Sequence, residues 1–217
     1  QSLQNKYFNE EIKKIELNDT SVKINLSPEK KITSFSGNYA LNNEKKLNYR
    51  FNNEIVKDLL KLDFTAQVDQ KIELDILNYV KPRGSIANIT VNLDKTKKNI
   101  KFNKISYKES NNSILLENLI YNNKIIKSFK KISVKTFKDK KINNDFSINS
   151  GNKIRIKGSN FDASNLAKQF KKKSNNKLLE QINKEIEIDF ENIFSPLSND
   201  LKNFKLIGSI KNGKFEK

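Results

Sequence analysis

The feature that most constrains the fold of this chain is a strict alternation of apolar and polar residues, which recurs in short segments. A repeat of two residues is the period of a β-strand with one apolar and one polar face. The clearest segments lie at residues 22–26, 64–68, 72–76, 87–93, 132–134, 154–156 and 186–188. Turn-forming residues separate them, such as those at 81–84 and 150–152. The pattern predicts a series of antiparallel hairpins.

Composition favours a thin structure over a two-layer core. Only 35% of the residues are hydrophobic and the mean hydropathy is −0.73, below the usage of a typical compact domain. One extended sheet with a single apolar face needs fewer apolar residues than a closed core. We therefore expect a mainly β fold, an extended and curved antiparallel β-sheet groove with one or two short helices, continuous over residues 1–217.

Two segments have helical rather than alternating spacing. In the first, Asn52 or Asn53 can cap a short helix that carries apolar residues at 55, 56, 59 and 60. In the second, Asp162 or Ser164 can cap a helix near residues 162–172. These are the two helices that the sequence predicts.

The apolar face of such a sheet must be covered by something, either a second layer of protein or a ligand. Acyl chains suit an open trough because they are apolar, flexible and tolerant of imprecise packing, with about 0.8 kcal/mol for each buried methylene. An equally simple reading is that these residues pack on one another as a core. The candidate lining comprises Val22, Ile24, Leu26, Phe64, Ala66, Val68, Ile72, Leu74, Ile76, Ala87, Ile89, Val91, Leu93, Ile132, Val134, Ile154, Ile156, Ile186 and Ile188.

The residue inventory argues against an enzyme. The chain has no His and no Cys, so it lacks the usual general base, the thiol nucleophile and the commonest metal ligands. No glycine-rich phosphate-binding loop precedes a helix. The acidic series at 185, 187, 189 and 191 alternates with apolar residues and reads as the polar face of a strand. We identify no catalytic, cofactor-binding or metal-binding residues and expect no cofactor.

The net charge of +17 leaves a second class of function open. A basic β-rich module can bind a polyanion such as nucleic acid. However, the lysines are spread along the whole chain, and aromatic residues do not alternate with them as in a single-strand binding platform. Abundant Lys, Asn and Ile together are also typical of an AT-rich genome. We therefore do not favour nucleic acid as the partner.

One unit has residue-level specificity. Residues 154–170 read IRIKGSNFDASNLAKQF, in which a short strand runs through Gly158 into Phe161, Asp162 and Leu166. This unit resembles the G-x-x-(L/F)-D-x-x-x-L pattern near the end of AsmA-like proteins, especially the YhdP-type branch. With the successive amphipathic strands, the resemblance covers mainly residues 60–217.

The resemblance implies a fragment from the C-terminal region of a periplasmic envelope protein, anchored to the inner membrane by an N-terminal segment outside this chain. The absence of Met and the start at Gln1 also favour a fragment. The family's implied role is to support phospholipid transport to the outer membrane and outer-membrane integrity. Its implied partners are phospholipid acyl chains, the inner membrane and outer-membrane components. For Asp162 the resemblance implies a structural role. A structural envelope module without cargo remains an alternative.

Overall fold

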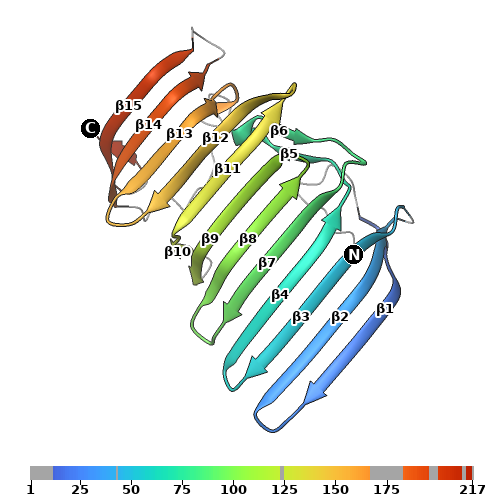
Figure 1. The fold of residues 1–217 in the computed structure, drawn as a ribbon. Helices are drawn as coiled ribbons and strands as arrows, with labels where there is room; N and C mark the ends of the chain where they lie inside the picture. The colour runs from blue at the N-terminus through green and yellow to red at the C-terminus, as the bar shows by residue number, and fades with distance from the viewer. Residues whose placement is uncertain are drawn as a thin grey trace.

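The fold is mainly β and consists of one large open sheet plus a small hairpin (Figure 1). The computed structural model describes residues 12–42, 44–122, 125–166, 183–195, 200–211 and 214–216. Within these ranges the strands follow the order β1-β2-β3-β4-β7-β8-β9-β11-β12-β13-β14-β15-β16, and β10 pairs with β9 off this path. The expectation of an extended and mostly antiparallel sheet is confirmed.

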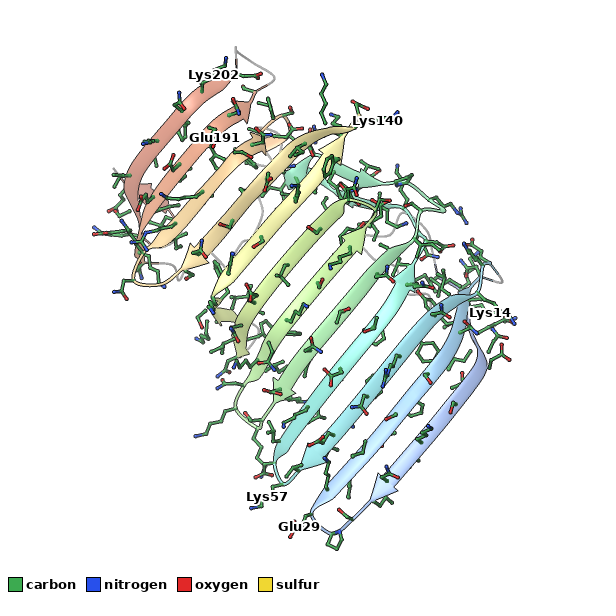
Figure 2. All side chains as sticks on the ribbon, viewed as in Figure 1. Lys14, Glu29, Lys57, Lys140, Glu191 and Lys202 are labelled. Atoms are coloured by element: carbon green, nitrogen blue, oxygen red, sulfur yellow. The ribbon has the colours of Figure 1, made fainter. Side chains whose placement is uncertain are left out.

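The strands run back and forth along the chain with short turns between most neighbours. Their bounds are β1 (Ile15–Leu26), β2 (Lys30–Leu41), β3 (Leu47–Val56), β4 (Leu59–Val68), β7 (Ala87–Lys95), β8 (Ile100–Glu109), β9 (Asn112–Asn122), β10 (Ile125–Ser128), β11 (Lys131–Lys138), β12 (Lys141–Ser150), β13 (Ile154–Asp162), β14 (Lys184–Phe194), β15 (Leu201–Lys211) and β16 (Lys214–Glu216). Figure 2 shows Glu29 and Lys57 at turns at one end of the strands and Lys140 at a turn at the other end.

One pair of strands departs from the antiparallel pattern. β13 and β14 pair in parallel, with Ile154 opposite Ile186 and Asp162 opposite Phe194. A parallel pair needs a connection that returns to the starting end of the first strand, and residues 163–183 form that connection. The alternation within each strand could not predict this direction, because it is the same for both pairings.

The prediction of a short helix capped by Asn52 or Asn53 is wrong. Residues 47–56 and 59–68 form the β3–β4 hairpin, in which Ile55 lies opposite Leu60 and Val56 opposite Leu59. Apolar residues at 55, 56, 59 and 60 fit one face of a helix, but they also fit a two-residue turn with paired flanks. Lys57 adopts a positive φ of 53° in that turn, and the β-branched Ile55 and Val56 favour strands.

The second expected helix falls mostly outside the described residues. Asp162 ends β13, Ser164 and Asn165 form a turn, and Leu166 begins a helical turn. The Asp162 carboxylate accepts a hydrogen bond from the Ser164 backbone N–H at 3.0 Å, a local contact typical of Asp at a turn. Residues 167–172 of the predicted helix lie outside the described ranges.

A small second unit lies on one face of the large sheet. It comprises β5 (Ile72–Leu74), the 3-10 helix η1 (Asp75–Leu77) and β6 (Tyr79–Lys81), and we call it the covering hairpin. The alternation at 72–76 predicted one strand of the sheet, but the strand ends at Leu74. Asn78 follows the 3-10 helix with a positive φ of 46°, so this segment turns back on itself.

Candidate functional site

The most regular feature of the sheet is a continuous row of apolar side chains that crosses it from β1 to β15. Residues paired in register on neighbouring strands point to the same face. The row, which we call the apolar row, consists of Val22, Phe35, Phe51, Phe64, Val91, Ile105, Leu116, Ile132, Ile148, Ile156, Ile188 and Leu206. Each strand on this path contributes one residue, so the apolar strip is unbroken over that width.

Most of the sequence-predicted lining residues lie on the same face as this row. Val22, Phe64, Val91, Ile132, Ile156 and Ile188 belong to the row itself. Others stand two or four positions along the same strands and therefore on the same face: Ile24, Leu26, Ala66, Val68, Ala87, Ile89, Leu93, Val134, Ile154 and Ile186. The structure thus brings together residues that the sequence could assign only strand by strand.

Three predicted lining residues lie elsewhere. Ile72, Leu74 and Ile76 belong to the covering hairpin and not to the large sheet. Ile72 is buried, Leu74 packs against the core cluster, and Ile76 is 55% exposed. They therefore form part of the cover of the apolar face and not of its floor.

The row also contains residues that were not among the predicted lining: Phe35, Phe51, Ile105, Leu116, Ile148 and Leu206. Most of them stand in short or mixed segments where the alternation is less clean. Phe35 and Phe51, for example, face each other across β2 and β3 with ring centroids 5.8 Å apart. Only the pairing register reveals that these residues continue the strip.

The covering hairpin closes one part of the apolar face. Leu77 and Tyr79 pack with Val134 in a buried cluster, and Tyr107 and Phe146 are among the residues that surround it. Of the elements that the structure describes, this hairpin is the one that packs onto the face. Its position near the ends of β9, β11 and β12 is visible in Figure 1.

Burial along the strands changes from one end to the other. Near the end where the hairpin lies, Leu47, Ala66 and Ala87 are almost fully buried. At the opposite end of β1, Leu26 is 72% exposed. Members of the apolar row between these extremes are half-buried, except for the exposed Val22. Burial is not limited to the hairpin end, because Leu119, Ile154 and Ile186 are buried as well. Among the described residues, the face is most accessible on β1.

Buried polar groups hold the hairpin to the sheet. Asn144 of β12 is fully buried, and its side-chain amide donates hydrogen bonds to the Leu77 carbonyl at 2.7 Å and the Thr136 hydroxyl at 2.8 Å. Its side-chain oxygen accepts a hydrogen bond from the Asp162 backbone N–H at 3.0 Å. Asn144 therefore joins three separate segments at a single point.

A second contact joins the hairpin to residues 158–166, which carry the family resemblance and which we call the landmark unit. Asn78 donates a hydrogen bond to the Asp162 carboxylate at 2.8 Å, and Asn143 donates a longer one at 3.4 Å. Asn165 in turn donates to the Asn78 side chain at 2.9 Å. Asp162 is thus an anchor between the covering hairpin and the end of β13.

A third anchor is built around Glu109. Its carboxylate accepts hydrogen bonds from Tyr79 at 3.1 Å, from Asn112 at 2.6 Å and from Ser85. Burial raises the pKa of the Tyr79 hydroxyl, which keeps it protonated as a donor. Beside this group Lys81 is completely buried, and its ammonium donates to the Gln70 and Pro82 carbonyls. Burial lowers the pKa of Lys81, although nearby acidic groups oppose that shift.

The two anchoring carboxylates are held in their charged form. Burial by itself would raise the pKa of Asp162 and of Glu109. The hydrogen bonds donated to each carboxylate outweigh that effect, so both pKa values lie below their ordinary range. A carboxyl group with a lowered pKa in the folded state stabilises the fold above its unfolded pKa, and that contribution is lost as the pH falls through the folded value.

We therefore expect the attachment of the hairpin to weaken in acid. Thermal unfolding should show a midpoint that falls as the pH drops from 7 to below about 4, the ordinary range of a carboxyl group. In Glu109→Gln the midpoint should be lower at pH 7, and its remaining pH dependence should be smaller. The matched control is Glu185→Gln at an exposed position. Equal pH dependence in the wild type and Glu109→Gln would contradict the assignment.

The landmark unit at residues 158–166 has a packing explanation in this fold. Gly158 stands between Phe146 and Phe190 in the register, and a Cβ atom there would lie 2.2 Å from the Asp145 carbonyl oxygen. Phe161 completes a cluster with both rings, each at a centroid distance of 5.6 Å. The residues that carry the family resemblance therefore form a strand–strand contact and an anchor for the hairpin.

The opposite face of the sheet is mainly polar from β1 to β14, although Leu115 and Ile207 also lie on it. The row next to the apolar row reads Lys23, Ser34, Asn52, Asp63, Asn92, Lys104, Glu117, Lys131, Asn149, Arg155 and Glu187. Cross-strand contacts join several of them, including Ser34 to Asn52 at 2.7 Å and Arg155 to Glu187 at 3.4 Å. The sheet therefore presents two chemically distinct surfaces.

A concavity of about 490 Å³ lies on this polar face, over β8 to β13. Serines at 106, 133 and 147 form its floor, and lysines at 104, 108, 135 and 157 stand around it. Sequence analysis could not predict this concavity, because its residues are separated along the chain and form no motif.

No family model, curated protein or solved structure matches this chain. Within the described ranges there is no helix with the length and apolar character needed to cross a membrane. The same residues contain no cluster of three or more acidic side chains that could hold a metal ion.

Proposed function

We propose that the apolar face of this sheet binds phospholipid acyl chains, and that the chain is a segment of an AsmA-like lipid-transport protein of the cell envelope. The observation that carries the proposal is the apolar row, which runs unbroken across the sheet while most of its members stay half-buried. In the described part of the chain, the covering hairpin packs on the region around Val134, and the row stays partly accessible on the strands beyond it.

An acyl chain matches the geometry of this surface. The apolar row runs across the strands, and neighbouring strands are about 4.8 Å apart, so the row offers a continuous contact longer than a single side chain. Each methylene that leaves water contributes up to about 0.8 kcal/mol. No directional contact is needed, which fits a face on which the residues differ in shape but share apolar character.

The resemblance of residues 158–166 to the AsmA-like pattern supports the same proposal. It carries with it the periplasmic location, the inner-membrane anchor outside this chain and the transfer of lipid toward the outer membrane. Those features rest on the resemblance, whereas acyl-chain binding also rests on the geometry of the face. The two parts of the proposal can therefore be tested separately.

A photo-crosslinking experiment tests the binding face. A photoreactive residue at Ile89 or Val91 should capture phospholipid from vesicles, because both positions face the apolar side of β7. The matched controls are Thr90 and Asn92, which lie on the same strand but face the polar side. We expect lipid adducts at the first pair only, detected by mass spectrometry. Equal labelling of both pairs would contradict a defined binding face.

A charge substitution provides a second readout of the same face. In Ile105→Asp, lipid capture by a crosslinker at Val91 should fall at least about tenfold, because a charge next to the chain must stay hydrated. Lys104→Asp places the same charge at an exposed position on the opposite face of the same strand and should leave capture unchanged. Circular dichroism would show whether each variant keeps its β content. Unchanged capture in Ile105→Asp would count against the proposal.

A further inference from the structure

We propose that the concavity on the polar face is a binding site for a small phosphate-bearing anion. This site lies on the side of the sheet opposite the acyl-binding face and does not depend on the proposed function. The inference rests on the shape of the concavity, on the hydrogen-bond donors that line it and on the lysine side chains beside it that form no ion pair.

The shape follows from side-chain size. Ser106, Ser133 and Ser147 stand in one register row across β8, β11 and β12. Their short side chains form a low floor, while the longer lysines on the same face rise around it. Ser106 is 7% exposed although it lies on the polar face, which reflects its position at the bottom. The volume of about 490 Å³ is enough for an anion larger than a single phosphate group.

The lining is rich in hydrogen-bond donors. Hydroxyl groups of Ser106, Ser113 and Ser133 line the concavity, and within the described part of the chain they form no hydrogen bond with another side chain or the backbone. Lysine ammonium groups add charged donors. Leu115 lies between Ser106 and Ser133 in the same register row and adds an apolar side chain to the lining. A lining of hydroxyls and ammonium groups suits the oxygens of a phosphate group and offers no stacking surface for an aromatic base.

The charges around the concavity are not balanced. Lys135 pairs with Asp145 at 3.4 Å, and Lys157 pairs with Asp189 at 3.5 Å. Lys104 and Lys108, both on β8, have no ion pair with any described residue, even though Glu117 lies opposite Lys104 in the register. Two unpaired ammonium groups therefore face the same side of a concave surface, which favours a ligand with negative charge.

The ligand chemistry is a phosphate ester, which a soluble metabolite or a lipid headgroup could supply. A lipid with its tails on the apolar face cannot present its headgroup here, because the whole sheet lies between the two surfaces. A headgroup would have to come from a membrane surface apposed to the polar face. The two sources can be distinguished by using separate probes.

Amide-resolved NMR tests the site in the full chain. Glycerol 3-phosphate is titrated at constant ionic strength, and in a parallel arm vesicles of phosphatidylglycerol are compared with vesicles of phosphatidylcholine. We expect saturable shifts at Ser106, Ser133 and Ser147 with the soluble ester. Localised broadening with phosphatidylglycerol alone would assign the same site to a membrane headgroup. Shifts spread evenly over lysine-bearing strands, or none with either probe, would overturn the proposal.

A pair of charge-matched variants gives the decisive comparison. Lys104→Gln combined with Lys108→Gln should weaken binding at least about tenfold, because two charge-assisted contacts are lost. Lys23→Gln combined with Lys205→Gln removes the same charge from the same face outside the concavity and should leave affinity unchanged. Equal weakening by both pairs would reduce the effect to general charge attraction and overturn the proposal. The proposal would also be overturned if a single-stranded oligonucleotide bound more tightly than the ester and lost the same affinity in both double variants.

Discussion

Replacing Asn144 with alanine should lower the free energy of unfolding by about 3 kcal/mol or more. The side chain is fully buried and forms hydrogen bonds with Leu77, Thr136 and Asp162. Alanine leaves a carbonyl, a hydroxyl and a backbone N–H without these partners in a site that water does not reach. Each unsatisfied buried group costs about 1–3 kcal/mol. Urea unfolding followed by circular dichroism would measure the change.

The matched control for this prediction lies on the same strand. Asn149 of β12 is exposed on the polar face and donates a single 3.3 Å hydrogen bond to Ser147. Asn149→Ala should change stability by no more than about 0.5 kcal/mol. If both alanine variants were equally stable, the anchoring role assigned to Asn144 would be wrong.

The same substitution has a consequence for the apolar face. Leu77 and Tyr79 pack on Val134, so a hairpin that detaches exposes additional apolar surface on β11. Under the proposed function, a crosslinker at Val134 should then capture more lipid in Asn144→Ala than in the wild type. A loss of all lipid capture would indicate that the hairpin contributes to the binding surface instead of limiting it.

Gly158→Ala should destabilise the sheet by about 3 kcal/mol, near the upper end of the range for overpacking. The added Cβ would lie 2.2 Å from the Asp145 carbonyl oxygen and 2.6 Å from the Phe146 Cα. These are backbone atoms, so no side-chain rotation relieves the overlap, and β12 and β13 must move apart. That movement also disturbs the packing between Phe146 and Phe190, whose ring centroids lie 5.8 Å apart.

Gly151 provides the control for this substitution. It lies in the turn before β13, and a Cβ atom there would meet no atom within 4 Å. Gly151→Ala should be neutral or slightly stabilising, because alanine restricts the unfolded chain more than glycine does. Thermal unfolding of both variants measures the difference. Similar midpoints would show that the strands yield easily at Gly158, and the packing account of the landmark unit would fail.

The prediction of strands and their faces succeeded where alternation was long and regular. Residues 87–93 of β7 and 64–68 of β4 are examples, and their apolar members share one face as expected. Prediction was wrong at 52–60, where the same apolar positions fit both a helix and a tight hairpin. It was also incomplete at 72–76, because the pattern could not distinguish a strand of the sheet from a hairpin that covers it.

The alignment of strands could not be predicted because it depends on local irregularities. The register shifts between β7 and β8 at Asn92 and Leu93, and Asn118 in β9 adopts a positive φ of 51°. A shift of one residue exchanges the two faces of a strand. These irregularities compensate one another, so that Leu93, Phe102 and Leu119 stay paired on the face that carries Val91, Ile105 and Leu116.

The amino-acid order was sufficient to establish that this chain forms amphipathic strands, because the side-chain period of two is a local property. It was also sufficient to argue against chemistry that needs His or Cys. Tertiary structure alone decided that the strands join in one open sheet, that β13 and β14 run in parallel and that the hairpin covers one end of the apolar face. The concavity on the polar face has the same origin. These features depend on contacts between residues far apart in the chain, which no local pattern records.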